Sequence, residues 1–297
     1  MRPASSFRWN LCCIFVFLGI ASLRSGPALA HPALPDRIRE LSGALSGHPD
    51  PAILLFERAE LYRRHGHFGE ARADYDEALR RRPDLHEVHV GRALLHGARD
   101  EWDEALDAVE RYLARKPDDA EATIVRARIL ERLGRNAEAI AEITRALQRH
   151  PRPEPAHYLL RADWIASRGP SFVEEAIRGL DEGQARFGVL ATLQLAAIER
   201  ERERGRFDAA LARLERLEPQ YDRRESLLAI RGDLLLAMGR FLEAQAAYTE
   251  AWEAIAALPD ATRASPATRK LTERLREAMR TPTTLADGND HAERSGR

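Results

Sequence analysis

A regular spacing of prolines is the feature that most constrains how this chain of 297 residues can fold. Pro49, Pro83, Pro117 and Pro151 follow one another at intervals of 34 residues. The same interval relates two sets of alanines, which are Ala59, Ala93 and Ala127, and Ala71, Ala105 and Ala139. Three registers that share one period indicate a repeated structural unit.

Each unit is predicted to be a pair of helices. Apolar or small residues recur at helical spacing from Leu55 to Tyr62 and from Ala71 to Leu79, with Gly66 between the two segments. Pro83 ends the second helix, because proline has no backbone N–H and restricts the residue before it. The alanines are small where two helices must approach within roughly 8 to 10 Å. One hairpin cannot bury its apolar face alone, so we expect neighbouring hairpins to stack.

Seven positions of the first full unit form a pattern, namely Leu55, Ala59, Tyr62, Ala71, Tyr75, Ala78 and Pro83. This unit resembles the tetratricopeptide repeat. The sequence departs from that family by having alanine where glycine is usual and arginine where leucine is usual, at Arg58, Arg92 and Arg126. We expect the arginine stems to pack while the charged heads reach outward. The resemblance implies an all-α fold, a right-handed α-solenoid of stacked helical hairpins that forms a superhelix.

The period also predicts how the chain is divided. We expect a capping half-repeat at 31–49, regular repeats at 50–83, 84–117 and 118–151, degenerate repeats at 152–188 and 189–222, a sixth repeat at 223–260, and a capping helix at 265–280. The fourth repeat has a longer turn after Gly169, and Gly183 and Gly188 are expected to loosen its second helix. Residues 281–297 show no apolar pattern and are expected to be disordered.

The first thirty residues have the character of a secretory signal. Arg2 and Arg8 precede an apolar or small run over 11–23, and cleavage is expected after Ala30. The run is shorter than the roughly 20 residues of a membrane-spanning helix, which favours a cleaved signal over an uncleaved anchor. Cys12 and Cys13 lie inside it, so the mature chain would contain no cysteine. We therefore predict a periplasmic or secreted protein with no integral membrane segment after cleavage.

Composition argues against several classes of function. The formal net charge of -1 is too close to neutral for a protein that binds nucleic acid through its phosphates. Lys116 and Lys270 are the only lysines, which argues against the lysine and asparagine clamp by which co-chaperones of the family hold terminal carboxylates. The sequence has no glycine-rich phosphate loop and no nucleophile elbow. We therefore expect neither catalysis nor a cofactor, and we expect the charged run 199–204 to be solvated helix surface.

Histidines gather in the second repeat, where His86, His89 and His96 lie roughly on one helix face. A metal ion or a glycan could use such a cluster. His89 and His96 also occupy positions where the repeat places packing aromatic residues, which favours a structural role. A non-catalytic envelope module that binds metal or glycan through these histidines therefore stays open as an alternative.

In tetratricopeptide stacks the first helix of each hairpin lines a concave groove. Aligning the units places the following residues there: Phe56, Glu60, Arg63, Arg64, Glu87, Val90, Leu94, Ile124, Arg128, Glu131, Arg132, Leu159, Asp163, Leu195 and Glu199. This mixed surface suits an extended or helical peptide. Its arginines at 63, 64, 128 and 132 could grip carboxylates bidentately. The resemblance thus predicts a scaffold for a protein or peptide partner, which the sequence does not identify.

Overall fold

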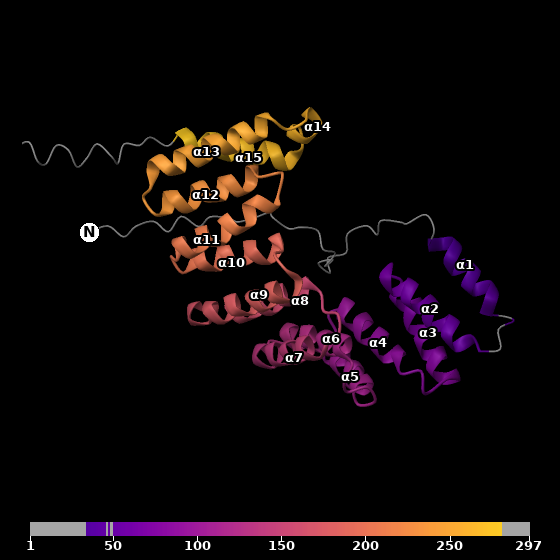
Figure 1. Ribbon diagram of the computed structural model, residues 1–297. Coiled ribbons are helices and arrows are strands. Elements are labelled where there is room, and N and C mark those ends of the chain that lie inside the picture. The colour runs from indigo at the N-terminus through magenta and orange to yellow at the C-terminus, as the bar shows by residue number, and fades with distance from the viewer. Residues whose placement is uncertain (1–33, 46, 48–49, 281–297) are drawn as a thin grey trace, which may run out of the picture. The chain divides into compact units, whose positions relative to one another are not determined.

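The computed structural model describes residues 34–45, 47 and 50–280, and Figure 1 shows helices throughout this part of the chain with no strand. The described chain divides between Pro117 and Asp118 into two compact units. The expected signal at 1–30 and the tail at 281–297 lie outside the described residues.

The first unit contains one single helix and two hairpins. Its elements are α1 (Leu34–Leu45), α2 (Pro51–Arg64), α3 (Phe68–Arg81), α4 (Glu87–Ala98) and α5 (Trp102–Leu113). The hairpins are α2–α3 and α4–α5, while α1 packs on α2 and α3 packs on α4. Each helix of this unit therefore packs against a helix that is next to it in the sequence.

The second unit continues the same pattern with four hairpins. They are α6 (Ala120–Arg132) with α7 (Asn136–Arg149), α8 (Pro155–Ala166) with α9 (Val173–Phe187), α10 (Ala191–Glu203) with α11 (Phe207–Leu217), and α12 (Glu225–Ala237) with α13 (Phe241–Ala256). The short helix α14 (Asp260–Arg263) leads into α15 (Pro266–Arg280), which packs on α13. Leu275 of α15 is fully buried, so this helix joins the core of the last hairpin.

The small residues lie where the two helices of a hairpin touch. Ala59 of α2 and Ala71 of α3 are fully buried. In the last hairpin Gly232 takes the place of the first alanine, and a methyl group there would lie 2.3 Å from Cε1 of the buried Tyr248. The absence of a side chain at this position is therefore a packing requirement.

The turn inside each hairpin requires one residue with a positive φ. Gly66 has φ of 80° between α2 and α3. At the corresponding place between α4 and α5, Asp100 has φ of 59°. This left-handed conformation ends the first helix and favours glycine or, less often, aspartate. The chain therefore reverses at the same point of each of these hairpins.

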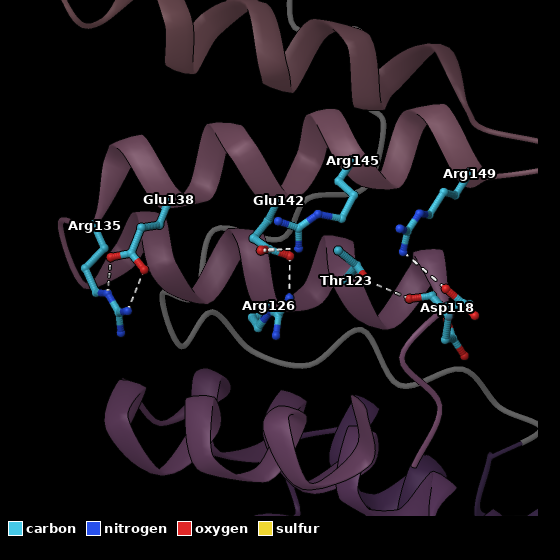
Figure 2. Close-up of polar contacts among 9 residues, drawn as sticks. Asp118, Thr123, Arg126, Arg135, Glu138, Glu142, Arg145 and Arg149 are labelled. Atoms are coloured by element: carbon cyan, nitrogen blue, oxygen red, sulfur yellow. Dashed lines mark hydrogen bonds and ion pairs between the residues drawn. The ribbon is translucent and has the colours of Figure 1, made fainter. Parts of the chain in front are cut away.

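The arginines that depart from the family pattern join neighbouring helices. Arg58 of α2 donates from Nε and Nη2 to the two carboxylate oxygens of Asp74 in α3, both at 2.7 Å. Figure 2 shows the equivalent pair in the third hairpin, where Arg126 of α6 contacts Glu142 of α7. The expectation that these charged heads reach outward is wrong. In both cases the guanidinium contacts a carboxylate that lies 16 residues further on, in the second helix of the same hairpin.

The fourth hairpin differs from the others as the sequence indicates, with one correction. A short 3-10 helix (Pro170–Phe172) fills the longer turn, and α9 then runs without interruption from Val173 to Phe187. Gly183 does not loosen this helix. It is buried where a methyl group would lie 2.9 Å from Leu193 and 3.1 Å from Tyr158, so glycine lets α9 approach its neighbours.

Replacing Gly232 with alanine tests the close approach of α12 and α13. We expect Gly232→Ala to lower the free energy of unfolding by about 1–3 kcal/mol, because the Tyr248 ring must move out of a well-packed site. Gly43→Ala in α1 is the matched control, since nothing lies within 4 Å of its added methyl group. Urea titration followed by circular dichroism measures both. Equal stability of the two variants would contradict the packing assignment.

Candidate partner-binding surfaces

In the first unit, part of the predicted surface is an internal polar network. Glu60 of α2 accepts a hydrogen bond from the Tyr75 hydroxyl in α3 and another, of 2.7 Å, from Nη2 of Arg63. The Glu60 and Arg63 side chains are only 19% and 16% exposed. Their charges therefore stabilise the junction of α2 and α3 and are largely withdrawn from solvent.

Hydrogen bonding keeps Glu60 ionised in spite of its burial. Burial alone would raise the pKa of this carboxyl, but hydrogen bonds from Arg63 and Tyr75 outweigh it and lower the pKa below 4.5. Burial and the neighbouring carboxylate raise the pKa of Tyr75. Arg63 is thus committed to a carboxylate of its own chain, which argues against its predicted role in gripping a partner.

Exposed apolar side chains are also present on the first helices of this unit. Ile53 of α2 is 41% exposed and Leu94 of α4 is 37% exposed, while Phe56 and Val90 are half-buried. Arg64 stands beside this apolar surface with 65% of its side chain exposed. We call these five residues the α2–α4 patch.

A shallow hollow of about 290 Å³ adjoins the α2–α4 patch. It is lined by Arg37, Leu41, Phe56, Glu57, Glu60, Leu61 and Arg64. Glu87, also predicted for this surface, is half-buried and accepts a 2.6 Å hydrogen bond from Lys116. The structure thus keeps an apolar surface with a charged rim on this unit.

In the second unit, the predicted residues fall into three groups. Ile124 is only 3% exposed, so its side chain packs inside and is removed from the candidate surface. Asp163 and Glu199 are paired with Arg200 at 2.7 Å and Arg202 at 2.6 Å, respectively. Arg128, Glu131, Leu159 and Leu195 are half-buried, and Arg132 is exposed.

Arg128 has an unusual environment for an arginine. Burial lowers its pKa, and this effect outweighs the nearby carboxylates Glu121 and Glu154, which act in the opposite direction. The guanidinium remains charged at neutral pH because arginine titrates far above it. Arg128 therefore adds positive charge to the space between these two acids.

A second hollow, of about 630 Å³, lies beside the longer turn of the fourth hairpin. Its lining is Asp163, Ala166, Ser167, Gly169, Pro170, Val173, Arg200, Glu203 and Arg204. Arg200 holds Asp163 and Glu203, and Arg204 donates to the Pro170 carbonyl at 3.0 Å. The charges around this hollow are thus balanced by one another.

The run 199–204 is not wholly solvated surface, contrary to expectation. Glu201 is 4% exposed and contacts Arg206 at 2.6 Å and Arg213 at 3.5 Å. Its register is that of Tyr62 in the first hairpin, where the repeat usually holds an aromatic ring. Glu201 therefore occupies a position that normally packs inside the hairpin. This register is the feature of the sequence that indicates its burial.

The histidines of the second repeat do not form a metal site in the structure. Within the described ranges, no three His, Cys, Asp or Glu side chains are arranged to hold a metal ion. His96 is hydrogen-bonded through Nδ1 to Glu101 at 2.7 Å, and burial beside Arg92 lowers the pKa of His89. His86, at the start of α4, is half-buried.

Comparison with known families identifies the repeat. The profile of the tetratricopeptide repeat matches residues 29–86, 56–120 and 90–152, and that of a tetratricopeptide repeat-like domain matches 179–269. The chain belongs to the tetratricopeptide-repeat family. A search of curated proteins found no significant match.

Solved structures with the same fold agree with this assignment. A tetratricopeptide repeat protein from Parabacteroides merdae aligns with a TM-score of 0.50 and 20% identity, over 84% of this chain and 93% of its own. The C-terminal part of a repeat-containing protein from Cytophaga hutchinsonii gives 0.61 and 14%, over 75% and 84%. PilW, a type IV pilus biogenesis factor, gives 0.51 and 20%, over 76% and 100%. The predicted all-α solenoid of helical hairpins is confirmed.

Replacing Glu60 with glutamine tests the internal network. We expect Glu60→Gln to lower stability at pH 7 by about 1–3 kcal/mol, because Arg63 loses its buried partner. The folded pKa of Glu60 is below 4.5, so its stabilisation is full above about pH 4.5 and is lost as pH falls through the folded pKa. The difference between wild type and variant should therefore narrow below pH 4, as measured by urea titration across pH. Glu104→Gln, at an exposed position of α5, should leave the wild-type profile unchanged.

Proposed function

We propose that this protein is an exported scaffold that binds a protein or peptide partner through the groove-lining faces of its first helices, and that it performs no catalysis. The α2–α4 patch carries this proposal. Its exposed isoleucine and leucine lie on α2 and α4, which pack against each other, and its Phe56 and Arg64 line the hollow. Apolar anchors with a polar edge suit a helical or extended peptide.

The patch also limits the chemistry of the partner. Arg63 and Glu60 satisfy each other, so a partner's charge would meet Arg64 and the rim of the hollow instead. We therefore propose a segment with apolar side chains and a nearby carboxylate. We do not propose the alternative of a metal site on His86, His89 and His96, because no described group of side chains there could hold a metal ion.

Two charge insertions test the α2–α4 patch. A photoreactive amino acid at position 94 in the native cell would first identify the bound protein. We then expect the double variant Ile53→Glu/Leu94→Glu to weaken the purified complex at least tenfold, about 1.4 kcal/mol, because two apolar anchors become charged. Calorimetry measures the affinity, and circular dichroism checks that the helices persist.

Leu242→Glu is the matched control for the patch. Leu242 is 83% exposed on α13 and lies outside the proposed surface. This variant should bind as tightly as wild type. If it weakens binding as much as the double variant does, or if the double variant binds normally, the patch is not the binding surface.

Export is the second part of the proposal. None of the described helices has the length and apolar character needed to cross a bilayer. The signal lies in 1–30, and we expect full-length expression in a bacterium to yield a periplasmic protein whose amino terminus is His31. Cell fractionation and intact-mass measurement check this outcome. A chain that keeps residues 1–30 in the membrane fraction would favour an anchor instead.

A further inference from the structure

The turn between α7 and α8 has very few backbone donors. Residues 150–155 read His-Pro-Arg-Pro-Glu-Pro. Proline has no N–H, so Arg152 and Glu154 carry the only backbone donors between His150 and Pro155. The conformation of this turn therefore depends on what these two N–H groups bind.

Both N–H groups donate to histidine rings. The N–H of Arg152 donates to Nδ1 of His150 at 3.1 Å, and the N–H of Glu154 donates to Nδ1 of His157 at 3.3 Å. Nε2 of His150 contacts Oε1 of Glu121 in α6 at 2.6 Å. A ring nitrogen that accepts a hydrogen bond carries no proton, so both neutral imidazoles hold their proton on Nε2.

The two rings lie inside the second unit. His150 is 9% exposed and His157 is 5% exposed, and their centroids are 6.1 Å apart. Arg186 of α9 donates to the carbonyls of His150 and Pro151 at 3.1 and 3.2 Å. The turn is thus held to α6, α8 and α9 by a small set of polar contacts.

The charges around the rings come from three elements and the turn. Glu121 and Arg128 face them from α6, Glu154 from the start of α8, and Arg186 from α9. At the end of α7, Arg149 is paired with Asp118 at 3.1 Å. Two acids and two arginines therefore surround the imidazoles, and the formal charges of these four groups cancel.

We propose that the α7–α8 turn is an acid-sensitive joint between the third and fourth hairpins. A second proton on either imidazole must go to Nδ1. That atom then becomes a donor, the facing backbone N–H loses its acceptor, and the two N–H groups repel. The joint loosens when these rings become charged.

The direction of the pH dependence follows from His157. Burial, together with Arg128 and His150, lowers the pKa of His157 below 6.5, although Glu121 and Glu154 act in the opposite direction. The opened joint binds the proton more readily than the closed one. The contribution of His157 to the stability of the closed joint is therefore fully present above about pH 6.5 and is lost as pH falls through the folded pKa of His157.

Hydrogen exchange of the wild-type protein tests the joint. We expect protection of the peptide 150–158, corrected for the intrinsic exchange rate, to fall at least about tenfold between pH 7.5 and 5.0, because the N–H groups of Arg152 and Glu154 lose their acceptors. Protection of α12 and α13 should stay unchanged. A wild type that keeps its protection at pH 5.0, or one that loses it equally in all helices, would refute a local joint.

A variant without these two histidines tests whether their protonation causes the loss of protection. Asparagine places an oxygen near the position of Nδ1, so His150→Asn/His157→Asn keeps the two acceptors. We expect its protection to change less than threefold over the same pH range, while the control His67→Asn, at an exposed turn of the first unit, behaves as wild type. A variant with the full wild-type loss of protection would overturn the proposal.

A measurement on the unmodified protein covers the case in which the double variant fails to fold. Nitrogen chemical shifts of the imidazoles report which ring nitrogen carries the proton. At pH 7.5 we expect His150 and His157 to be neutral with the proton on Nε2. A proton on Nδ1 of either ring at that pH would contradict the proposal.

Discussion

The whole structure depends on how closely two antiparallel helices can approach within one hairpin. Ala59 and Ala71 are fully buried at such a contact, and Gly232 leaves room for the Tyr248 ring at another. Dense packing at these points lets the hairpin act as one rigid unit. Since one hairpin alone still has an uncovered apolar face, neighbouring hairpins within each unit pack on one another, and α15 covers the last one by burying Leu275.

Polar side chains also reinforce this packing. Several residues predicted to bind a partner make these internal contacts instead. Glu60 and Asp233 each accept a hydrogen bond from a tyrosine 15 residues further on, Tyr75 and Tyr248. Buried charges of this kind are tolerated only when they are paired. A carboxylate on the first helix is thus often a structural partner, and exposed Ile53, Leu94 and Arg64 become the better candidates for recognition.

The sequence predicted the register of the candidate surface better than the role of each residue. Helical spacing placed Phe56, Glu60 and Arg63 on one face of α2, but it could not show that Tyr75 from α3 would reach Glu60. It also could not show that Ile124 would be buried. Spacing within one helix says which residues share a face. The packing partners from other helices decide how much of that face remains accessible.

The sequence by itself determined the period, the helical hairpins and the family, because small residues, turn glycines and prolines act locally and recur at fixed intervals. Only the tertiary structure decided which charges are internal. Arg58 reaches Asp74, Glu201 lies between Arg206 and Arg213, and His150 joins the α7–α8 turn to Glu121. These contacts join different helices or a helix and a turn, and their distances depend on how the helices pack, which no local pattern encodes.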